Sequence, residues 1–133
     1  MIRHLNELFA EEIEAAVRYI HLATTVKGID RLQVRKVLLD GIAETIEHAQ
    51  VVGEKILRLG GVPDLDIRIQ LPAQLHTGEE ALRTALEFEQ AALDGYGDLL
   101  DRVKGHVTLE DFARAQIEVE SEHVAELRLM IGD

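Results

Sequence analysis

The sequence predicts an all-α protein, a four-helix bundle built from two antiparallel hairpins that are joined by a long crossover. Three observations lead to this prediction. Apolar residues recur at helical spacing in four long segments, glycines separate the two segments of each pair, and a longer stretch without helical period separates the pairs. With 133 residues in the chain, we expect a single domain over residues 1–133.

The first pair of helices is expected at residues 5–26 and 31–59. Gly28 separates them, Asp30 stands where its side chain can cap the second helix, and residues 60–63 end it. The inner row expected on the first helix is Leu5, Leu8, Glu12, Ala15, Tyr19, Leu22 and Val26. The inner row expected on the second is Val37, Gly41, Glu44 or Thr45, His48, Val52 and Ile56.

The second pair begins after a predicted capping box of Thr77 and Glu80 and is divided at Gly105. Thr108 is expected to cap the last helix, which runs to Ile131. The inner row expected on the third helix is Leu82, Leu86, Glu89, Ala92 or Leu93, Tyr96, Leu100 and Val103. The row on the fourth is Leu109, Phe112, Ala113, Gln116, Glu120, His123, Val124, Leu127, Met130 and Ile131.

Residues 61–77 lack a helical period and decide the topology. At ~3.3 Å per residue this segment can stretch about 56 Å, whereas the second helix is about 44 Å long at 1.5 Å per residue. The segment can therefore return along the whole bundle, and the second and third helices are expected to run parallel.

The composition narrows the function classes. The chain has 25 acidic and 14 basic residues and a net charge of −11, which argues against binding nucleic acid or an anionic membrane. No cysteine is present, so disulfides, thiolate metal sites and thiol catalysis are excluded. No signal-peptide pattern or membrane-length apolar run is seen, and we expect a cytoplasmic protein.

Carboxylates and imidazoles interrupt the inner rows where apolar residues are expected. Glu12, Glu89 and Glu120 have no Lys or Arg in neighbouring inner positions. The separation in sequence between Glu12 and His48 is similar to that between Glu89 and His123. The two halves thus repeat, which predicts that these groups meet at one level of the bundle. Buried carboxylates need protons or a cation. Ligation by oxygen and imidazole suits iron, manganese or zinc; a structural network with protonated histidines is the alternative.

The chain resembles the ferritin-like superfamily, and bacterioferritin in particular, through Ala-Glu-Glu12-Ile-Glu-Ala, His48-Ala, Lys55-Ile-Leu-Arg-Leu-Gly-Gly-Val-Pro63 and Glu120-Ser-Glu-His123. The resemblance implies a ferroxidase di-iron centre with six ligands. Five of them match Glu12, His48, Glu89, Glu120 and His123. The resemblance also implies that Tyr19, a candidate catalytic residue, lies beside the metals.

Three positions depart from the family pattern. Thr45 stands where a sixth, bridging glutamate is expected, so Glu44 becomes the substitute candidate and the number of bound ions, two or one, is left open. Ile46 replaces the methionine that holds haem in bacterioferritin, so we do not expect haem. The family's short fifth helix, which helps to close the large cage, is also absent before the sequence ends at Asp133, so the choice between the usual cage and a dimer is left open.

Second apolar rows on the first two helices predict a two-fold homodimer through that face, the pairing usual among ferritin-like proteins. These rows are Ile13, Val17, Ile20, Leu39, Ile42, Ile46, Ala49 and Gly53. A larger assembly is left open. The remaining histidines, His4, His21, His76 and His106, are expected at the surface.

These observations favour a ferritin-like protein that binds iron and oxidises Fe(II) with O₂ or peroxide, for storage or detoxification. One rival is a redox enzyme of the rubrerythrin, manganese catalase or oxygenase kind. Another is a non-catalytic metal-binding bundle in which Thr45 marks a degraded centre. The physiological metal, the oxidant and any organic substrate stay open at this stage.

Overall fold

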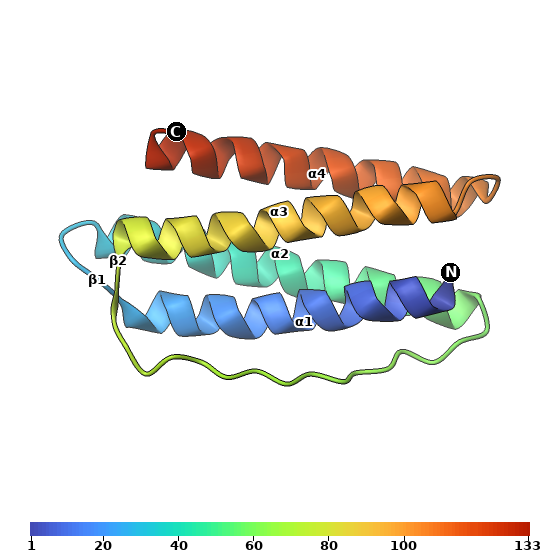
Figure 1. Cartoon of the computed structure of the whole chain (residues 1–133), viewed down its shortest axis with the longest axis horizontal. Coiled ribbons are helices and arrows are strands. Elements are labelled where there is room, and N and C mark those ends of the chain that lie inside the picture. Colours follow the sequence, from blue (N-terminus) through green and yellow to red (C-terminus); the bar gives the residue numbers. More distant parts are fainter.

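Four long helices make up most of the chain, and the computed structural model describes all 133 residues. Their bounds are α1 Ile2–Thr25, α2 Arg31–Arg58, α3 Gly78–Arg102 and α4 Val107–Ile131. Figure 1 shows two antiparallel hairpins, α1 with α2 and α3 with α4, and a long connection that runs back along the bundle. Because of this connection α2 and α3 run parallel, so the predicted topology is confirmed.

The connection is tied to the bundle at both ends. Near its start, the backbone N–H of Asp64 donates to the Asn6 side-chain oxygen over 2.8 Å. At its end, two short strands, β1 (Val26–Lys27) and β2 (His76–Thr77), pair in parallel and join the end of α1 to the start of α3. The sequence analysis missed this pairing, because two-residue strands leave no periodic signal.

The strand pairing places His76 inside the molecule. Its side chain is buried, and its Nδ1 donates to the Thr25 hydroxyl over 3.1 Å, while that hydroxyl donates to the backbone oxygen of His21. The expectation that His76 lies at the surface was therefore wrong. His4, His21 and His106 are partly exposed.

Helix starts follow the predicted capping only in part. The capping box of Thr77 and Glu80 is present, with reciprocal hydrogen bonds to both backbone N–H groups. Asp30 makes no capping hydrogen bond; its carboxylate lies instead against Gly78, so closely that a side chain there would overlap it. The prediction that Thr108 caps α4 was also wrong, because α4 begins at Val107 and Thr108 lies inside its first turn. The backbone N–H of Gly105, just before the helix, donates to the Glu110 carboxylate over 2.6 Å.

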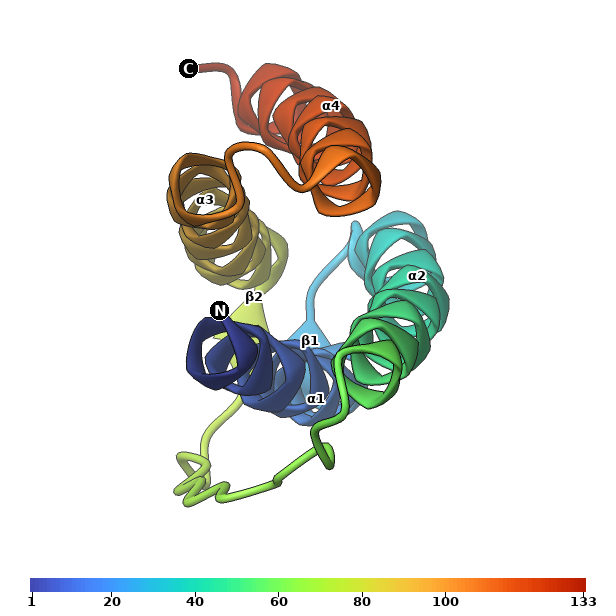
Figure 2. The ribbon, with the colours of Figure 1, turned by 90° about the vertical axis from the view of Figure 1, so that its right-hand side faces the viewer.

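The predicted inner rows form the core with small shifts. On α2 the buried apolar positions include Leu38 and Ala49, whereas Val37 and Gly41 are half-buried. Two apolar clusters result, one at each end of the bundle. The first is centred on Leu5, Leu8, Val52, Ile56, Tyr96 and Leu99, and the second on Tyr19, Leu22, Leu38, Ala81, Leu82 and Leu127. Figure 2 shows the four helices around the shared interior.

The outer face of α1 and α2 keeps large apolar side chains in contact with solvent. Val17, Ile20, Leu39 and Ile46 are between 36% and 49% exposed. Ala49 and Gly53, which were expected on this face, are buried within the chain. None of the helices is both long enough and apolar enough to span a lipid bilayer.

Candidate metal centre

Three buried carboxylates lie between the two apolar clusters. Glu12 on α1 is 6% exposed, Glu89 on α3 is 8% exposed and Glu120 on α4 is 2% exposed. Each stands at an inner position of its helix, where the 3.6-residue period turns the side chain toward the bundle axis. Burying three carboxylates together is unfavourable unless positive charge is supplied.

Two histidines lie beside Glu120, one facing each of its carboxylate oxygens. Nδ1 of His48 lies 3.3 Å from Oε1 of Glu120 and 3.6 Å from Oε2 of Glu12. Nδ1 of His123 lies 3.5 Å from Oε2 of Glu120 and 3.4 Å from Oε2 of Glu89. Charged N–H···O bonds are usually about 2.7–2.9 Å long. The imidazoles and carboxylates therefore lie close together, but at distances longer than a charged hydrogen bond.

The converging atoms form two groups that share one residue. Glu12, His48 and Glu120 each offer one ligand atom, and so do Glu89, Glu120 and His123, with all atoms of a group within 4.8 Å of one another. Oε2 of Glu120 is fully enclosed and lacks a hydrogen-bond partner. An enclosed carboxylate oxygen without a partner, facing an imidazole nitrogen, is the environment that a cation would complete.

Two tyrosines hold the outer carboxylates across the bundle. The Tyr19 hydroxyl on α1 donates to Oε1 of Glu89 over 2.5 Å, and the Tyr96 hydroxyl on α3 donates to Oε1 of Glu12 over 3.1 Å. Each tyrosine thus orients the carboxylate of the opposite hairpin. A side chain at Gly41 would press on the Tyr19 ring, since a Cβ there would lie 3.2 Å from it.

Tyr96 was predicted to be an inner residue but not a site residue. A signal for this role was present in the sequence, because Tyr96 follows Glu89 at the spacing at which Tyr19 follows Glu12. Burial is the main cause that raises the pKa of both phenols, and the neighbouring carboxylates raise it further. Both hydroxyls therefore keep their protons and act as donors.

Glu44 lies beside the two groups and belongs to neither. Its side chain is 49% exposed, and its Oε2 lies 2.7 Å from Nε2 of His123, the ring nitrogen opposite the one that faces Glu89 and Glu120. A carboxylate on the outer nitrogen commonly fixes the orientation of a metal-binding histidine. Thr45 is buried, and its hydroxyl donates to the Gly41 carbonyl oxygen over 2.7 Å.

The charges of the site are interdependent. Burial would lower the pKa of His48, but Glu12 and Glu120 outweigh it and raise the pKa to about 10. Contacts with Glu120 and Glu89 raise the pKa of His123 to about 10, against the effect of burial. Burial would raise the pKa of Glu120, yet His123 and His48 lower it to about 2. Burial raises the pKa of Glu89. Without a metal, both imidazoles therefore carry protons.

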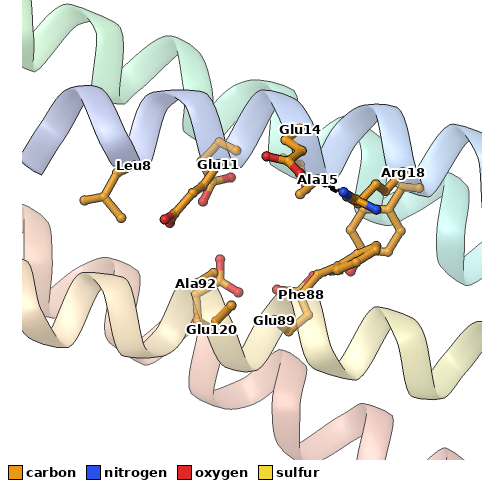
Figure 3. Close-up of a pocket in the computed structure, with 13 residues that line it drawn as sticks. Leu8, Glu11, Glu14, Ala15, Arg18, Phe88, Glu89, Ala92 and Glu120 are labelled. Atoms are coloured by element: carbon orange, nitrogen blue, oxygen red, sulfur yellow. Dashed lines mark hydrogen bonds and ion pairs between the residues drawn. The ribbon is translucent and has the colours of Figure 1, made fainter. Parts of the chain in front are cut away.

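Two cavities lead to this cluster from opposite sides. The first, of about 230 Å³, lies between α1 and α3 and is lined by Glu12, Glu89, Glu120 and Thr45 among others. Glu89 and Glu120 can be seen at this cavity in Figure 3. The second, of about 220 Å³, is lined by Asp40, Glu44, Glu126 and His123. Both contain several carboxylates, so both are suited to attract cations.

Comparison with known proteins identifies the fold. A family model described as a ferritin-like domain matches residues 2–133. Among curated proteins, no sequence matches this chain. A ferritin-like, diiron-carboxylate protein from Bacillus anthracis str. Ames is 28% identical, with a TM-score of 0.86 over 98% of this chain and 94% of that one.

Two further solved structures extend the comparison. The bacterioferritin-related protein from Bacteroides fragilis, a dodecameric thioferritin, is 26% identical, with a TM-score of 0.86 over 96% of this chain and 81% of that one. Antigen TpF1 from Treponema pallidum is 13% identical, with a TM-score of 0.91 over 99% of this chain and 91% of that one, a likeness of fold alone. With the family model matching almost the whole chain, this protein belongs to the ferritin-like domain family.

Proposed function

We propose that this protein binds two Fe(II) ions as substrate and oxidises them with O₂ or peroxide. The observation that carries the proposal is the pair of ligand groups that share Glu120. Each group contains an imidazole and a carboxylate of its own, and the donor set of oxygen and nitrogen without sulfur suits iron. The diiron-carboxylate relative from Bacillus anthracis supports iron over manganese or zinc.

In this proposal, Glu12 and His48 hold one ion, Glu89 and His123 hold the other, and Glu120 contacts both. Iron bound there supplies electrons to the oxidant as Fe(II) becomes Fe(III). The protein's own contribution is to concentrate negative charge and exclude bulk water, since all three carboxylates are buried. Both imidazoles must lose a proton to bind metal, and they release it to solvent.

The tyrosines have positioning roles. Tyr19 and Tyr96 donate protons in hydrogen bonds to one oxygen each of Glu89 and Glu12, which leaves the other oxygen of each carboxylate facing its histidine. Glu44 holds the outer nitrogen of His123 and turns the ring toward the site. Tyr19 also remains our candidate for a catalytic residue, because it is the tyrosine that the family resemblance places at the centre.

We also propose that residues 1–133 act as one domain and assemble through the apolar outer face of α1 and α2. Exposed Val17, Ile20, Leu39 and Ile46 supply the surface that a two-fold partner would cover. The dodecameric relative from Bacteroides fragilis supports an assembly larger than a dimer. Sedimentation analysis tests this, since an Ile20→Glu and Ile46→Glu double variant is expected to dissociate.

Anaerobic Fe(II) titration followed by air exposure tests the proposed reaction. Two ions bound per chain, oxidised rapidly in air, are the expected result. Glu120→Ala should abolish both binding and rapid oxidation, whereas Glu118→Ala, which changes an exposed glutamate of the same helix, should change neither. Binding of no iron, or equal oxidation rates with and without Glu120, would refute the proposal and leave a structural bundle.

A further inference from the structure

The connection between α2 and α3 contains a segment, residues 64–71, that has no part in the metal centre. Its sequence is Asp-Leu-Asp-Ile-Arg-Ile-Gln-Leu, with a proline on either side at positions 63 and 72. Figure 1 shows the connection stretched out along α1, and Figure 2 shows it on the side of α1 that lies away from α3 and α4. Polar and apolar residues alternate in this segment, as they do in a strand that buries one face.

The two faces of the segment differ in exposure. Ile67 and Ile69 are half-buried, and Leu65 is 50% exposed. The side chains of Asp66 and Arg68 are 84% and 92% exposed. The apolar residues therefore face the helices and the charged residues face solvent. Because half of Leu65 stays exposed, the chain covers its own apolar face only in part.

The backbone of the segment has an open edge. The N–H of Asp64 donates to the Asn6 side chain of α1 over 2.8 Å, and residues 65–71 make no backbone hydrogen bond within the chain. In an extended chain, the N–H groups of successive residues point to opposite edges. Those of Leu65, Ile67 and Ile69 therefore point away from the edge that meets Asn6. A row of free N–H and C=O groups is the surface to which another extended chain can add as a strand.

The segment is complementary to a second copy of itself in one antiparallel register. Pairing centred on Ile67 puts Asp66 of each copy opposite Arg68 of the other. A shift of one residue would turn the apolar face of one copy to solvent. A shift of two residues would put Asp66 opposite Asp66, or Arg68 opposite Arg68, and like charges directly opposite each other destabilise a sheet.

We propose that two copies of this chain pair through this segment as antiparallel strands, over residues 64–70 and centred on Ile67. The inference rests on the proposed assembly through the outer face of α1 and α2, because a two-stranded ladder alone is only marginally stable in water. Both surfaces involve α1, since Val17 and Ile20 belong to it, so one two-fold partner can contact both. The ladder fixes the alignment of the two copies, and the apolar helix faces supply most of the buried surface.

Crosslinking of the full chain tests the register. The sequence contains no cysteine, so Ile67→Cys introduces one thiol per chain, which the ladder places about 5.5 Å from its counterpart between Cα atoms. A short bifunctional thiol reagent is expected to join most chains in pairs. Gln70→Cys is the matched control, because the two copies of this position would lie about 20 Å apart along the strands at ~3.3 Å per residue. It should stay uncrosslinked, and equal crosslinking of the two variants would overturn the register.

Charge reversal tests the pairing without a crosslink. Arg68→Asp places an aspartate opposite Asp66 at both cross-strand positions, and it is expected to raise the dissociation constant of the dimer about tenfold. Combining Asp66→Arg with Arg68→Asp restores opposite charges and should restore the assembly. Lys104→Asp makes a reversal of the same size at an exposed position between α3 and α4 and should have no effect. Sedimentation velocity over a concentration series measures all three, and no recovery in the combined variant would overturn the ion pairing.

The outcomes separate the ladder from the proposed assembly. Dimers or larger particles in which Ile67→Cys does not crosslink would overturn the ladder and keep the helix faces as the interface, with the open edge free for an extended peptide of another protein. Monomers at all concentrations would overturn the ladder and the assembly together. Neither measurement uses iron, so a failure of the proposed reaction is detected separately.

Discussion

The α1–α2 hairpin and the α3–α4 hairpin present the same set of side chains to the centre but contribute unequally. Each has a carboxylate, a tyrosine that reaches the opposite hairpin and a histidine. Only the second hairpin supplies the shared carboxylate, Glu120, which is the most buried of the three. Thr45, at the corresponding place in the first hairpin, bonds to its own backbone.

This difference indicates which substitution should weaken metal binding most. In the proposed two-ion centre, a symmetric arrangement would have two shared carboxylates, one from each hairpin. Here both imidazoles face Glu120, one through each of its oxygens. We therefore expect the second hairpin to dominate metal binding, and the following predictions test this comparison from the largest effect to the smallest.

Replacing the shared carboxylate should have the largest effect. Glu120→Gln keeps the shape but removes the charge that both groups need, so we expect both ions to be lost, with affinity lowered 100-fold or more, above the usual range of about 10–100 for supporting groups. Glu12→Gln should lose only the ion beside His48. Metal analysis after anaerobic Fe(II) loading measures both. Equal losses in the two variants would contradict the unequal roles of the hairpins.

The pH dependence of the metal-free protein should show both imidazolium contacts. The pKa of His48 and of His123 rises from the ordinary imidazole value of 6.5 to about 10 on folding. The stabilisation is therefore fully present below pH 6.5 and is lost as pH rises through 10. We expect Tm to fall by roughly 5 °C or more across this window, the shift that about 1–2 kcal/mol gives.

Glutamine at both histidine positions should flatten that pH profile, which is the control. Glu120 has the opposite behaviour. Its pKa falls from the ordinary glutamate value of 4.5 to about 2, so its stabilisation is present above pH 4.5 and is lost as pH falls through 2. Because metal displaces the imidazole protons, ion affinity should rise with pH up to about 10, and proton release on binding should approach two per chain near neutral pH. A pH-independent affinity would contradict the assignment of both histidines.

The two tyrosines offer a matched pair with a smaller effect. Removing the hydroxyl in Tyr19→Phe or Tyr96→Phe eliminates a hydrogen bond to a carboxylate, which typically costs about 1.5–3 kcal/mol. The bond from Tyr19 is 2.5 Å long and that from Tyr96 is 3.1 Å, so Tyr19→Phe should cost more. Chemical denaturation measures the difference, and a larger loss for Tyr96→Phe would reverse the expected ranking.

The smallest effect concerns the helix starts of the second hairpin. Thr77 makes a capping box at α3, whereas Thr108 makes no capping bond at α4. Thr77→Ala should therefore cost about 1 kcal/mol, and Thr108→Ala should stay within about 0.5 kcal/mol. Urea unfolding of the two variants checks this, and equal costs would show that the observed capping contributes nothing.

Periodicity in the sequence was enough to predict the four helices, their pairing and the long crossover, because amphipathic helices carry their inner face in their spacing. It also predicted that Glu12, Glu89 and Glu120 meet with His48 and His123, since equal distances from the turns put them at one height. It could not predict β1 and β2 or the burial of His76, because these arise from two segments far apart in the chain.

Capping was harder to predict for a related reason. Asp30 and Thr108 are residue types that often cap helices, but the Asp30 carboxylate lies against Gly78, and Thr108 lies inside the first turn of α4, whose N-cap residue is His106. Local sequence offers several partners for each free N–H group, and the packing of the helices selects among them. Glu44 illustrates the same limit, because its place on the helix did not indicate which nitrogen of His123 it would meet.

The amino-acid sequence by itself determined which residues face the interior, because in a helix the spacing between residues fixes the direction in which their side chains point. It also determined that position 45 carries a threonine and not a carboxylate. Only the tertiary structure decided how those residues combine: that Glu120 is shared by both histidines, that each tyrosine crosses to the other hairpin, and that a cavity adjoins Thr45. The physical reason is that shared ligands, crossed hydrogen bonds and empty space depend on distances between helices, which the spacing within each helix does not contain.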